Sequence, residues 1–389
     1  MKHIGLLLHF YQPPTQDLGL VSAIDEECYY PVFSLLERSA AAVTVNICYS
    51  LTEHLERLGS PSLSRLASAH GVELCSSAAF HPILPLIPES EVVRQLRLNL
   101  LGNRRVLGNV FAPTGVFPPE MAWSVGTGRT IAGDGYRWVI TDDLPWTATG
   151  HEAPFDSVLR SGNVLVLMRS NFWSNRIAFH PSEGDAVAAS LCAGLDSWVR
   201  RKGRGPGGDC YLIIAMDGET FGHHTRGTIE TFLAPFISKL AGIDGARLST
   251  LSEIAGSFPA MEAEVPAGSW STTAGDVGRG VPYPLWADPG NATHGALRAV
   301  RDMVLEWARS CSGSRVADLA DRMLYSCPFW WASDGRVDPV QVRRGVLLLV
   351  QTAGEAFRET GDGRLVDEVM TRVSRIPLLI GGDSDAQEG

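Results

Sequence analysis

The sequence predicts an α/β protein, in which a seven-stranded (β/α)7 barrel is followed by a C-terminal helical region. Seven short apolar runs alternate with segments of helical spacing, a pattern typical of a parallel sheet covered on both faces. Polar residues follow most of these runs, and no further run appears after about residue 256. We therefore predict the barrel at residues 1–255 and, at residues 256–389, a helical region that packs on it and contributes to the cleft.

The seven runs have the length and the apolar content of buried parallel strands. They occupy residues 3–8, 43–47, 72–74, 115–117, 138–141, 164–168 and 211–216. Between them, helical spacing of apolar residues appears at 51–58, 90–107 and 185–199. Beyond a stretch rich in Gly, Pro, Ser and Thr, the spacing predicts helices at 292–310, 315–325, 339–359 and 364–375.

Composition excludes several classes of protein. The formal charge is −10 and no basic cluster appears, so we expect no nucleic-acid partner. No stretch approaches the ~20 apolar residues of a membrane span, and the N-terminal apolar run is too short for a signal peptide, so we expect a cytoplasmic protein. The seven cysteines are scattered without a CxxC pair, which indicates neither a disulfide framework nor a zinc knuckle, and we expect no metal or cofactor.

Two acids at strand ends carry the chemistry that we infer from the residues. Glu120 lies in GVFPPEMAW and Asp217 lies in CYLIIAMDGETFGHH. The carboxyl ends of barrel strands converge on one mouth, so both side chains are expected there. Each alone could be a structural hydrogen-bond anchor, but together they fit the paired carboxylates of glycoside hydrolysis.

These segments resemble glycoside hydrolase family 57, the retaining enzymes that act on α-glucans. HFYQPP, GVELCSSAAFHPILPLI, GVFPPEMAW and AMDGETFGHH are similar to four of its motifs, in family order, and YPLWADPGNATH and SCPFWWAS resemble segments of its helical region. The resemblance implies that Glu120 is the nucleophile and Asp217 the general acid/base. It implies an α-glucan substrate, an oligo- or polysaccharide, and an enzyme of amylase, glucanotransferase or branching type, with hydrolysis and transfer both open. Tyr11 stands where the family usually has a second histidine.

We expect further residues of these segments and of the strand ends to bind substrate. They are His9, Gln12, Glu73, His81, Trp123, Asp142, Arg169, Glu219, His223, Trp286 and Trp330. Structural roles stay open for several of them: Glu73 pairing with Arg169, tryptophans in the core, and His223 as a capping group.

Two other functions remain alternatives. A metal-dependent polysaccharide deacetylase also uses a seven-stranded barrel, and this chain offers Asp142, Asp143, His180, His223 and His224. Adjacent histidines do not easily coordinate one ion from a regular element, which argues against that enzyme. The third possibility is a carbohydrate-binding relative that keeps the barrel without turnover.

Overall fold

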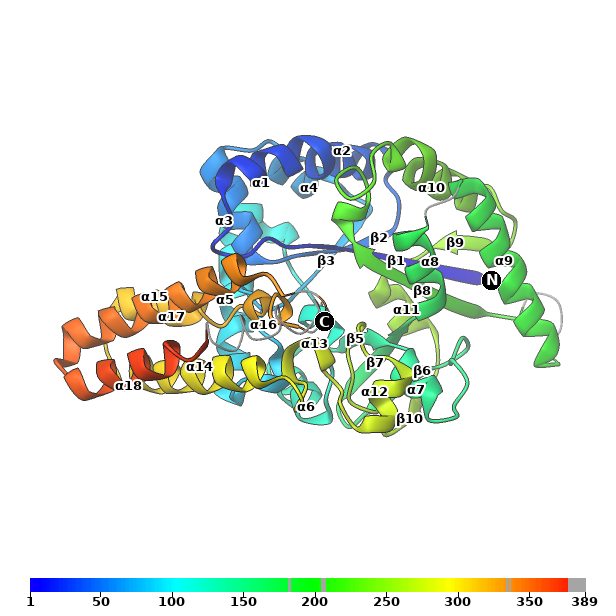
Figure 1. Cartoon of the computed structure of the whole chain (residues 1–389). Helices are drawn as coiled ribbons and strands as arrows, with labels where there is room; N and C mark the ends of the chain where they lie inside the picture. Colours follow the sequence, from blue (N-terminus) through cyan, green and yellow to red (C-terminus); the bar gives the residue numbers. More distant parts are fainter. Residues whose placement is uncertain (181–182, 204–207, 334, 336, 377–389) are drawn as a thin grey trace, which may run out of the picture.

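The structure is a computed structural model that describes residues 1–376 except 181–182, 204–207, 334 and 336. The end of the predicted helical region, residues 377–389, therefore lies outside the described residues. The described chain forms a mostly parallel α/β sheet with helices around it and a helical arm on one side (Figure 1). The mixed α/β class with a helical C-terminal region is thus confirmed.

Each of the seven predicted runs coincides with a strand, and three further strands lie outside those runs. The strands are β1 (Lys2–Phe10), β2 (Val43–Ile47), β3 (Val72–Cys75), β4 (Gly115–Val116), β5 (Trp138–Asp142), β6 (Val158–Ser161), β7 (Val164–Arg169), β8 (Cys210–Asp217), β9 (Ala246–Leu248) and β10 (Ala260–Glu262). Our expectation that no strand follows residue 256 is wrong, because β10 pairs with β6. The domain boundary at 255/256 remains a prediction.

The sheet curves into a barrel-like arrangement without closing as a continuous ladder. Parallel pairing runs from β4 through β5, β7, β8, β1 and β2 to β3, while β6 forms an antiparallel hairpin with β7. Between β3 and β4, one parallel bridge joins Ser76 and Val116. The Ser76 N–H donates to Gly115 O at 2.8 Å, and the Phe117 N–H donates to Ser76 O at 2.8 Å. The carboxyl ends of the parallel strands therefore face one side of the barrel.

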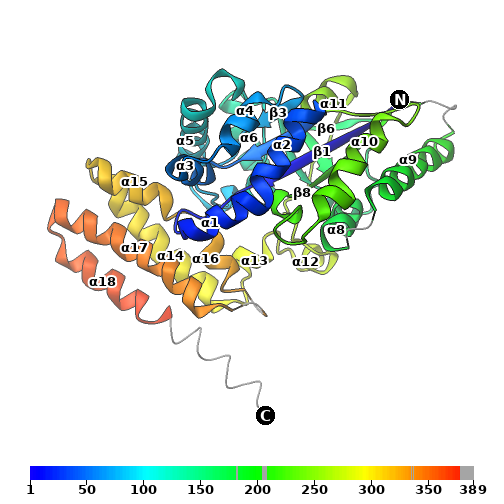
Figure 2. The same cartoon turned by 90° about the horizontal axis from the view of Figure 1, so that it is seen from above.

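Helices surround the sheet and form the arm. Those up to residue 287 are α1 (Leu18–Ile24), α2 (Tyr30–Ser39), α3 (Tyr49–Leu58), α4 (Ser62–Ser68), α5 (Glu89–Leu107), α6 (Val125–Gly133), α7 (Leu144–Ala148), α8 (Asn171–Phe179), α9 (Gly184–Arg201), α10 (Ala234–Ala241), α11 (Leu251–Ser257), α12 (Ala274–Arg279) and α13 (Pro284–Ala287). The rest are α14 (Ala292–Ser310), α15 (Ser314–Arg322), α16 (Cys327–Trp330), α17 (Pro339–Thr360) and α18 (Gly363–Val373). Helices α14, α15, α17 and α18 make up the arm. Figure 2 shows them side by side, at the end of the molecule opposite the N-terminus.

Successive side chains of β1 point alternately into two hydrophobic cores, one outside and one inside the barrel. Leu6 and Leu8 pack outward with the surrounding helices, whereas Leu7 packs inward with the strand interior. Gly5 leaves room for α11 at the amino end of the strands, because a Cβ there would lie 2.9 Å from Ile254 Cδ1. Helix α11 therefore plugs that end of the barrel, and the opposite end is left for a site.

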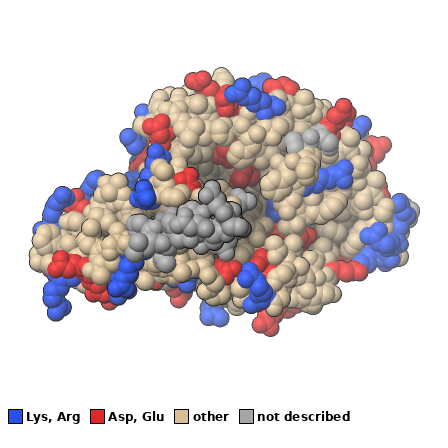
Figure 3. Space-filling model, viewed as in Figure 1, with Lys and Arg blue, Asp and Glu red and all other residues tan. Residues whose placement is uncertain are grey.

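Charged side chains of both signs are spread over the surface. On the face shown in Figure 3, Lys and Arg side chains are interspersed with Asp and Glu and form no continuous basic patch among the described residues. None of the described helices combines the length and the apolar character that crossing a bilayer requires.

Candidate active site

The two candidate catalytic acids lie at strand ends on the open side of the barrel. Asp217 is the last residue of β8 and stands beside His9 of β1 in the strand register. Glu120 follows β4 after Pro118 and Pro119. The charge of Asp217 raises the pKa of Glu120, so the two carboxyls lie close enough to interact.

Glu120 is held in a strained turn. Glu120 and Met121 both have left-handed backbone, with φ of 59° and 52°. Non-glycine residues adopt this region at a cost of about 1–3 kcal/mol and keep it only where their surroundings impose it. The Trp270 backbone N–H donates to Glu120 O at 3.1 Å, and its indole Nε1–H donates to Glu120 Oε2 at 2.7 Å. Trp270 therefore fixes both the backbone and the carboxyl of Glu120.

Burial sets the proton affinity of the pair. Burial, and then the charge of Asp217, raise the pKa of Glu120 to about 8, against the lowering effect of the Trp270 hydrogen bond. Burial also raises the pKa of Asp217, opposed by His9 and Arg169. Two interacting carboxyls in a dry site resist double ionisation, so the pair retains a proton near neutral pH.

His9 and His81 form a neutral pair beside these acids. Burial lowers the pKa of both rings. The His9 Nδ1–H donates to Asn46 Oδ1 at 2.7 Å, which leaves Nε2 as the acceptor from His81 Nε2–H at 3.2 Å. The His9 ring also stacks on Phe117 with centroids 4.4 Å apart. Both rings are therefore fixed in tautomer and in orientation.

The helical region completes this cluster. The Ser326 Oγ lies 3.1 Å from His81 Nδ1, and the Ser326 N–H donates to His81 O at 3.1 Å. Tyr11 stacks on His81 at 3.9 Å between centroids, and its hydroxyl lies 3.4 Å from Cys327 Sγ. Tyr11, the residue that departs from the family motif, thus joins the barrel mouth to α16.

Glu219 is a third buried acid next to Asp217. The Tyr29 hydroxyl donates to its Oε1 at 2.7 Å, and Gln12 Nε2 donates to the same oxygen at 3.5 Å. Burial, followed by the charge of Asp217, raises the pKa of Glu219 to about 8. Gln12 and Glu219 are therefore held by protein contacts at the edge of the acid pair.

Arg169 supplies a buried positive charge on the other side. It pairs with Asp142 through Nη1 and Oδ2, and its Nε–H donates to Ala215 O at 2.8 Å. Its guanidinium lies 5.6 Å from the Trp270 ring centroid. Because Arg169 lowers the pKa of Asp217, it favours the ionised form of that acid.

Glu73 lies away from this cluster. Its carboxylate accepts from Thr44 Oγ1 at 2.9 Å, and from both the N–H (3.2 Å) and the Oγ–H of Ser252 in α11. Thr44 and Ser252 belong to the plugged, amino end of the barrel, so the structure does not bring Glu73 to the other candidates. The pairing of Glu73 with Arg169 considered above is not formed, since Arg169 pairs with Asp142.

The tryptophan candidates are buried or half-buried, and His223 pairs with a glutamate. Trp123 and Trp286 are fully buried, and Trp123 Nε1 donates to Val265 O at 3.1 Å. A buried ring has no free face for a sugar, so we carry neither forward as a substrate contact. Trp330 is half-buried against the core of the helical region. His223 Nδ1 lies 3.0 Å from Glu27 Oε2, on the rim.

Several residues of the site escaped the sequence reasoning. They are Trp270, Phe117, Asn46 and Cys327. Phe117 and Asn46 lie in predicted strand runs and Cys327 in a segment of the family resemblance, but none of the four was expected in the site. A group of candidate metal ligands also went unnoticed: His9, Cys48 and His81 are buried with ligand atoms within 4.8 Å of one another. Its signal is spatial alone, because the three residues come from three separate segments of the chain.

Two interacting, buried carboxyls at the mouth of a parallel α/β sheet are an arrangement that enzymes of glycosidic-bond cleavage use. Residues 10–266 match the model of glycosyl hydrolase family 57, and the chain belongs to that family. The resemblance drawn from the motifs is thereby confirmed.

Individual relatives are more distant. An α-amylase of Pyrococcus horikoshii is 30% identical over 148 residues, which cover 37% of this chain and 23% of that protein. The 4-α-glucanotransferase of Thermococcus litoralis superposes with a TM-score of 0.72 and 17% identity, over 92% of this chain and 59% of that one. The family 57-type branching enzyme of P. horikoshii gives a TM-score of 0.73 and 15% identity, over 96% and 94%. The chain thus spans less than two thirds of the amylase and of the glucanotransferase, and the two structures show the shared fold.

Proposed function

We propose that this chain is a retaining enzyme that acts on α-glucans, with Glu120 as nucleophile and Asp217 as general acid/base. The observation that carries the proposal is the strained, hydrogen-bonded Glu120 beside a buried Asp217 of raised pKa. Family membership supports it, as do the names of similar proteins, an α-amylase, a glucanotransferase and a branching enzyme.

The mechanism follows from the two carboxyls. A Glu120 oxygen attacks the anomeric carbon while Asp217 gives its proton to the leaving oxygen, so one C–O bond forms as the other breaks. Asp217 then takes a proton from water or from a sugar hydroxyl, whose oxygen displaces Glu120. The acceptor decides between hydrolysis and transfer. We propose cleavage through a glycosyl-enzyme, with either water or a sugar as acceptor. His9, Gln12, His81 and the Arg169–Asp142 pair would shape the sugar subsite around it.

The test compares rescue by azide in two variants. Glu120→Gly removes the nucleophile, makes room for azide and suits the positive φ, whereas Asp217→Asn removes the acid/base. With an activated aryl α-glucoside, azide should give a product of inverted configuration from the first variant and of retained configuration from the second. Exchanged configurations would exchange the two roles. Glu73→Gln is the matched control, an acid at the plugged end whose loss should leave both steps unchanged.

The non-catalytic alternative is tested by incubation with maltooligosaccharides and chromatography of the products. If the unaltered chain cleaves or transfers the sugars and Glu120→Gly does not, the non-catalytic alternative is excluded. Binding without turnover from pH 5 to 9 would favour a carbohydrate-binding role instead.

The triad of His9, Cys48 and His81 keeps the metal-dependent alternative testable. Metal analysis of the purified protein and assay after a chelator address it. We expect turnover to survive the chelator, since the proposed mechanism uses carboxyls alone. Stoichiometric metal with chelator-sensitive activity would overturn the glycosidase assignment.

The cysteines bear on the compartment. All seven are free, and five of them are buried. Free cysteines are typical of reducing compartments, which supports the cytoplasm as the location.

A further inference from the structure

Two imidazole nitrogens face each other inside the barrel mouth. His9 Nε2 and His81 Nε2 lie 3.2 Å apart, and both side chains are buried. Tetrahedral zinc binds histidine nitrogens at about 2.0–2.1 Å, which places two such nitrogens about 3.3 Å from each other. The separation of this pair therefore suits one shared ion as well as one shared proton.

Cys48 brings a thiol to the same place. It directly follows β2, and its side chain is fully buried. One ligand atom each from His9, Cys48 and His81 lies within 4.8 Å of the other two. A sulfur and a nitrogen on one tetrahedral zinc ion lie about 3.6 Å apart, so the sulfur has to approach by no more than about 1.2 Å. Two imidazoles and a thiol are thus within reach of one ion.

The outer contacts of both imidazoles are those of metal-binding histidines. Such residues almost always donate their other ring N–H to a neighbouring acceptor, which fixes the ring. His9 Nδ1 lies 2.7 Å from Asn46 Oδ1, and His81 Nδ1 lies 3.1 Å from Ser326 Oγ. Both rings are therefore held with Nε2 toward the partner ring.

Negative charge near these residues favours a cation. Glu120 Oε1 lies 3.9 Å from His81 Nδ1. Burial lowers the pKa of His9 and the charge of Asp217 opposes that shift, so Asp217 lies close enough to act on this ring. Even with one retained proton, the two acids carry a negative charge that attracts a cation. The positive charge of Arg169 is already paired with Asp142.

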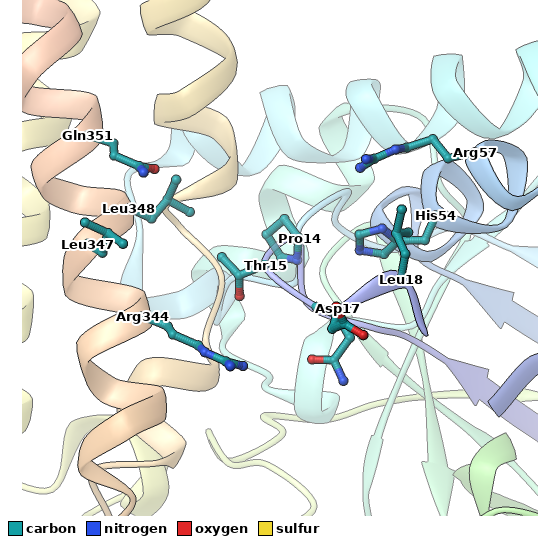
Figure 4. Close-up of a pocket in the computed structure, with 11 residues that line it drawn as sticks. Pro14, Thr15, Asp17, Leu18, His54, Arg57, Arg344, Leu347, Leu348 and Gln351 are labelled. Atoms are coloured by element: carbon teal, nitrogen blue, oxygen red, sulfur yellow. The ribbon is translucent and has the colours of Figure 1, made fainter. Parts of the chain in front are cut away.

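Figure 4 shows a larger cavity that offers no comparable set of ligands. It has a volume of about 550 Å³ and lies between segment 14–18, α3 and α17. The described residues that line it include one histidine, His54, and one acid, Asp17, but no cysteine. Arg57 and Arg344 also line it, and their charge disfavours a cation. The group at the mouth is therefore better suited to a metal ion.

We propose that His9, Cys48 and His81 bind one zinc ion, and that the ion excludes sugar from this part of the mouth. Neutral imidazole nitrogens and a thiolate are ligands that zinc prefers. Binding moves the His81 proton from Nε2 to Nδ1, where Ser326 Oγ accepts it, and releases the Cys48 thiol proton to solvent. Zinc is thus a blocking ligand and not part of the reaction, so a chelator preserves or raises turnover.

The zinc site does not depend on the roles given to Glu120 and Asp217, whereas the exclusion of sugar rests on the proposed substrate site. Calorimetric titration of the metal-free full chain with zinc chloride tests the first part. We expect one ion per chain, with a dissociation constant of about 1 µM or tighter. Cys48→Ser should weaken binding at least about 10-fold, because it removes the thiolate ligand.

Cys210→Ser is the matched control. Cys210 is also buried, but it begins β8 at the amino end of the barrel. This variant should change the zinc affinity less than about 2-fold. Cobalt(II) gives a second readout, because a cobalt–thiolate bond absorbs in the near ultraviolet by charge transfer. That band should appear in the unaltered chain and in Cys210→Ser, but not in Cys48→Ser.

Maltose tests the exclusion of sugar, and it should weaken zinc binding by at least about 5-fold. Zinc binding that maltose leaves unchanged would refute the exclusion alone. Equal zinc affinity in Cys48→Ser and the unaltered chain, or no binding at about 100 µM zinc, would refute the site itself. Unfolding temperatures within about 2 °C of the unaltered chain establish that a loss of binding is not a loss of fold. Cys48→Ala replaces Cys48→Ser if the latter fails that check.

Discussion

Trp270 controls Glu120 from a segment 150 residues further along the chain. Its indole N–H donates to the carboxyl and favours the ionised form, because a hydrogen bond to the charged state lowers a pKa. In the mechanism that we propose, Glu120 must be ionised to attack, and this single donor offsets part of the effect of burial, which raises the pKa of Glu120.

Trp270→Phe should therefore raise the pKa of Glu120 further. The acidic limb of the kcat/KM profile, which follows the ionisation of Glu120, should move to higher pH. Activity should therefore be lost at pH 6 and partly recovered at pH 8. Trp123→Phe is the control, because its indole donates to Val265 O away from the acids. A limb that stays in place in Trp270→Phe would contradict the role of this donor.

At the residue scale, the sequence was informative wherever a polar side chain directly follows an apolar run. His9, Asp142, Arg169 and Asp217 end strands of the sheet and are close to one another, as strand convergence requires. Trp270 could not be found in this way, because it lies in a loop whose position depends on long-range packing. Glu73 was misleading, since it lies within a run and faces the plugged end of the barrel.

At the scale of elements, the ends of β5 and β7 are joined by the buried pair of Asp142 and Arg169, whose side chains are 0% and 4% exposed. Arg169→Met should lower the free energy of unfolding by about 3–5 kcal/mol, because Asp142 is then left as an uncompensated buried charge. Denaturant titration measures the change. Arg105→Met removes an exposed pair with Glu56 and should cost less than about 1 kcal/mol. Similar costs for both variants would contradict this account.

The contact between β3 and α11 makes a different prediction. Glu73→Ala leaves the Ser252 N–H and hydroxyl without their acceptor, and should destabilise the chain by about 1–3 kcal/mol. Turnover well below the unfolding temperature should stay within about 2-fold, because this end of the barrel is distant from the acids. A specific rise in KM would return Glu73 to the substrate site.

Buried apolar content decides which strands a sequence reveals. The seven predicted runs carry enough buried apolar residues for a pattern to appear. Strands β9 and β10 have three residues each, and all three of β10 are exposed, so no periodicity marks them. They form by pairing with β1 and β6, which are distant in sequence.

At the scale of the whole molecule, ion pairs fasten the arm to the barrel. Asp321 of α15 is 3% exposed and accepts from Arg94 of α5 at 2.5 and 2.7 Å. Arg309 of α14 donates to the same carboxylate at 2.6 Å and to Glu91 at 2.7 Å. The arm and the barrel should therefore unfold in one transition.

Asp321→Ala should lower the free energy of unfolding by about 3 kcal/mol or divide the single transition into two, because two arginines lose their common acceptor. Asp318→Ala is the matched control on the same helix, since its pair with Arg322 is 42% exposed on the acid side. It should cost less than about 1 kcal/mol. Calorimetry distinguishes a single transition from two.

The contacts of Ser326 and Cys327 with His81 and Tyr11 have a consequence for the timing of synthesis. All ten described strands are complete by residue 262, yet the partners of His81 and Tyr11 emerge from the ribosome more than 60 residues later. A nascent chain can therefore assemble the whole sheet while its mouth still lacks one wall. Catalytic competence would then arise abruptly, near the end of translation, rather than growing with the barrel.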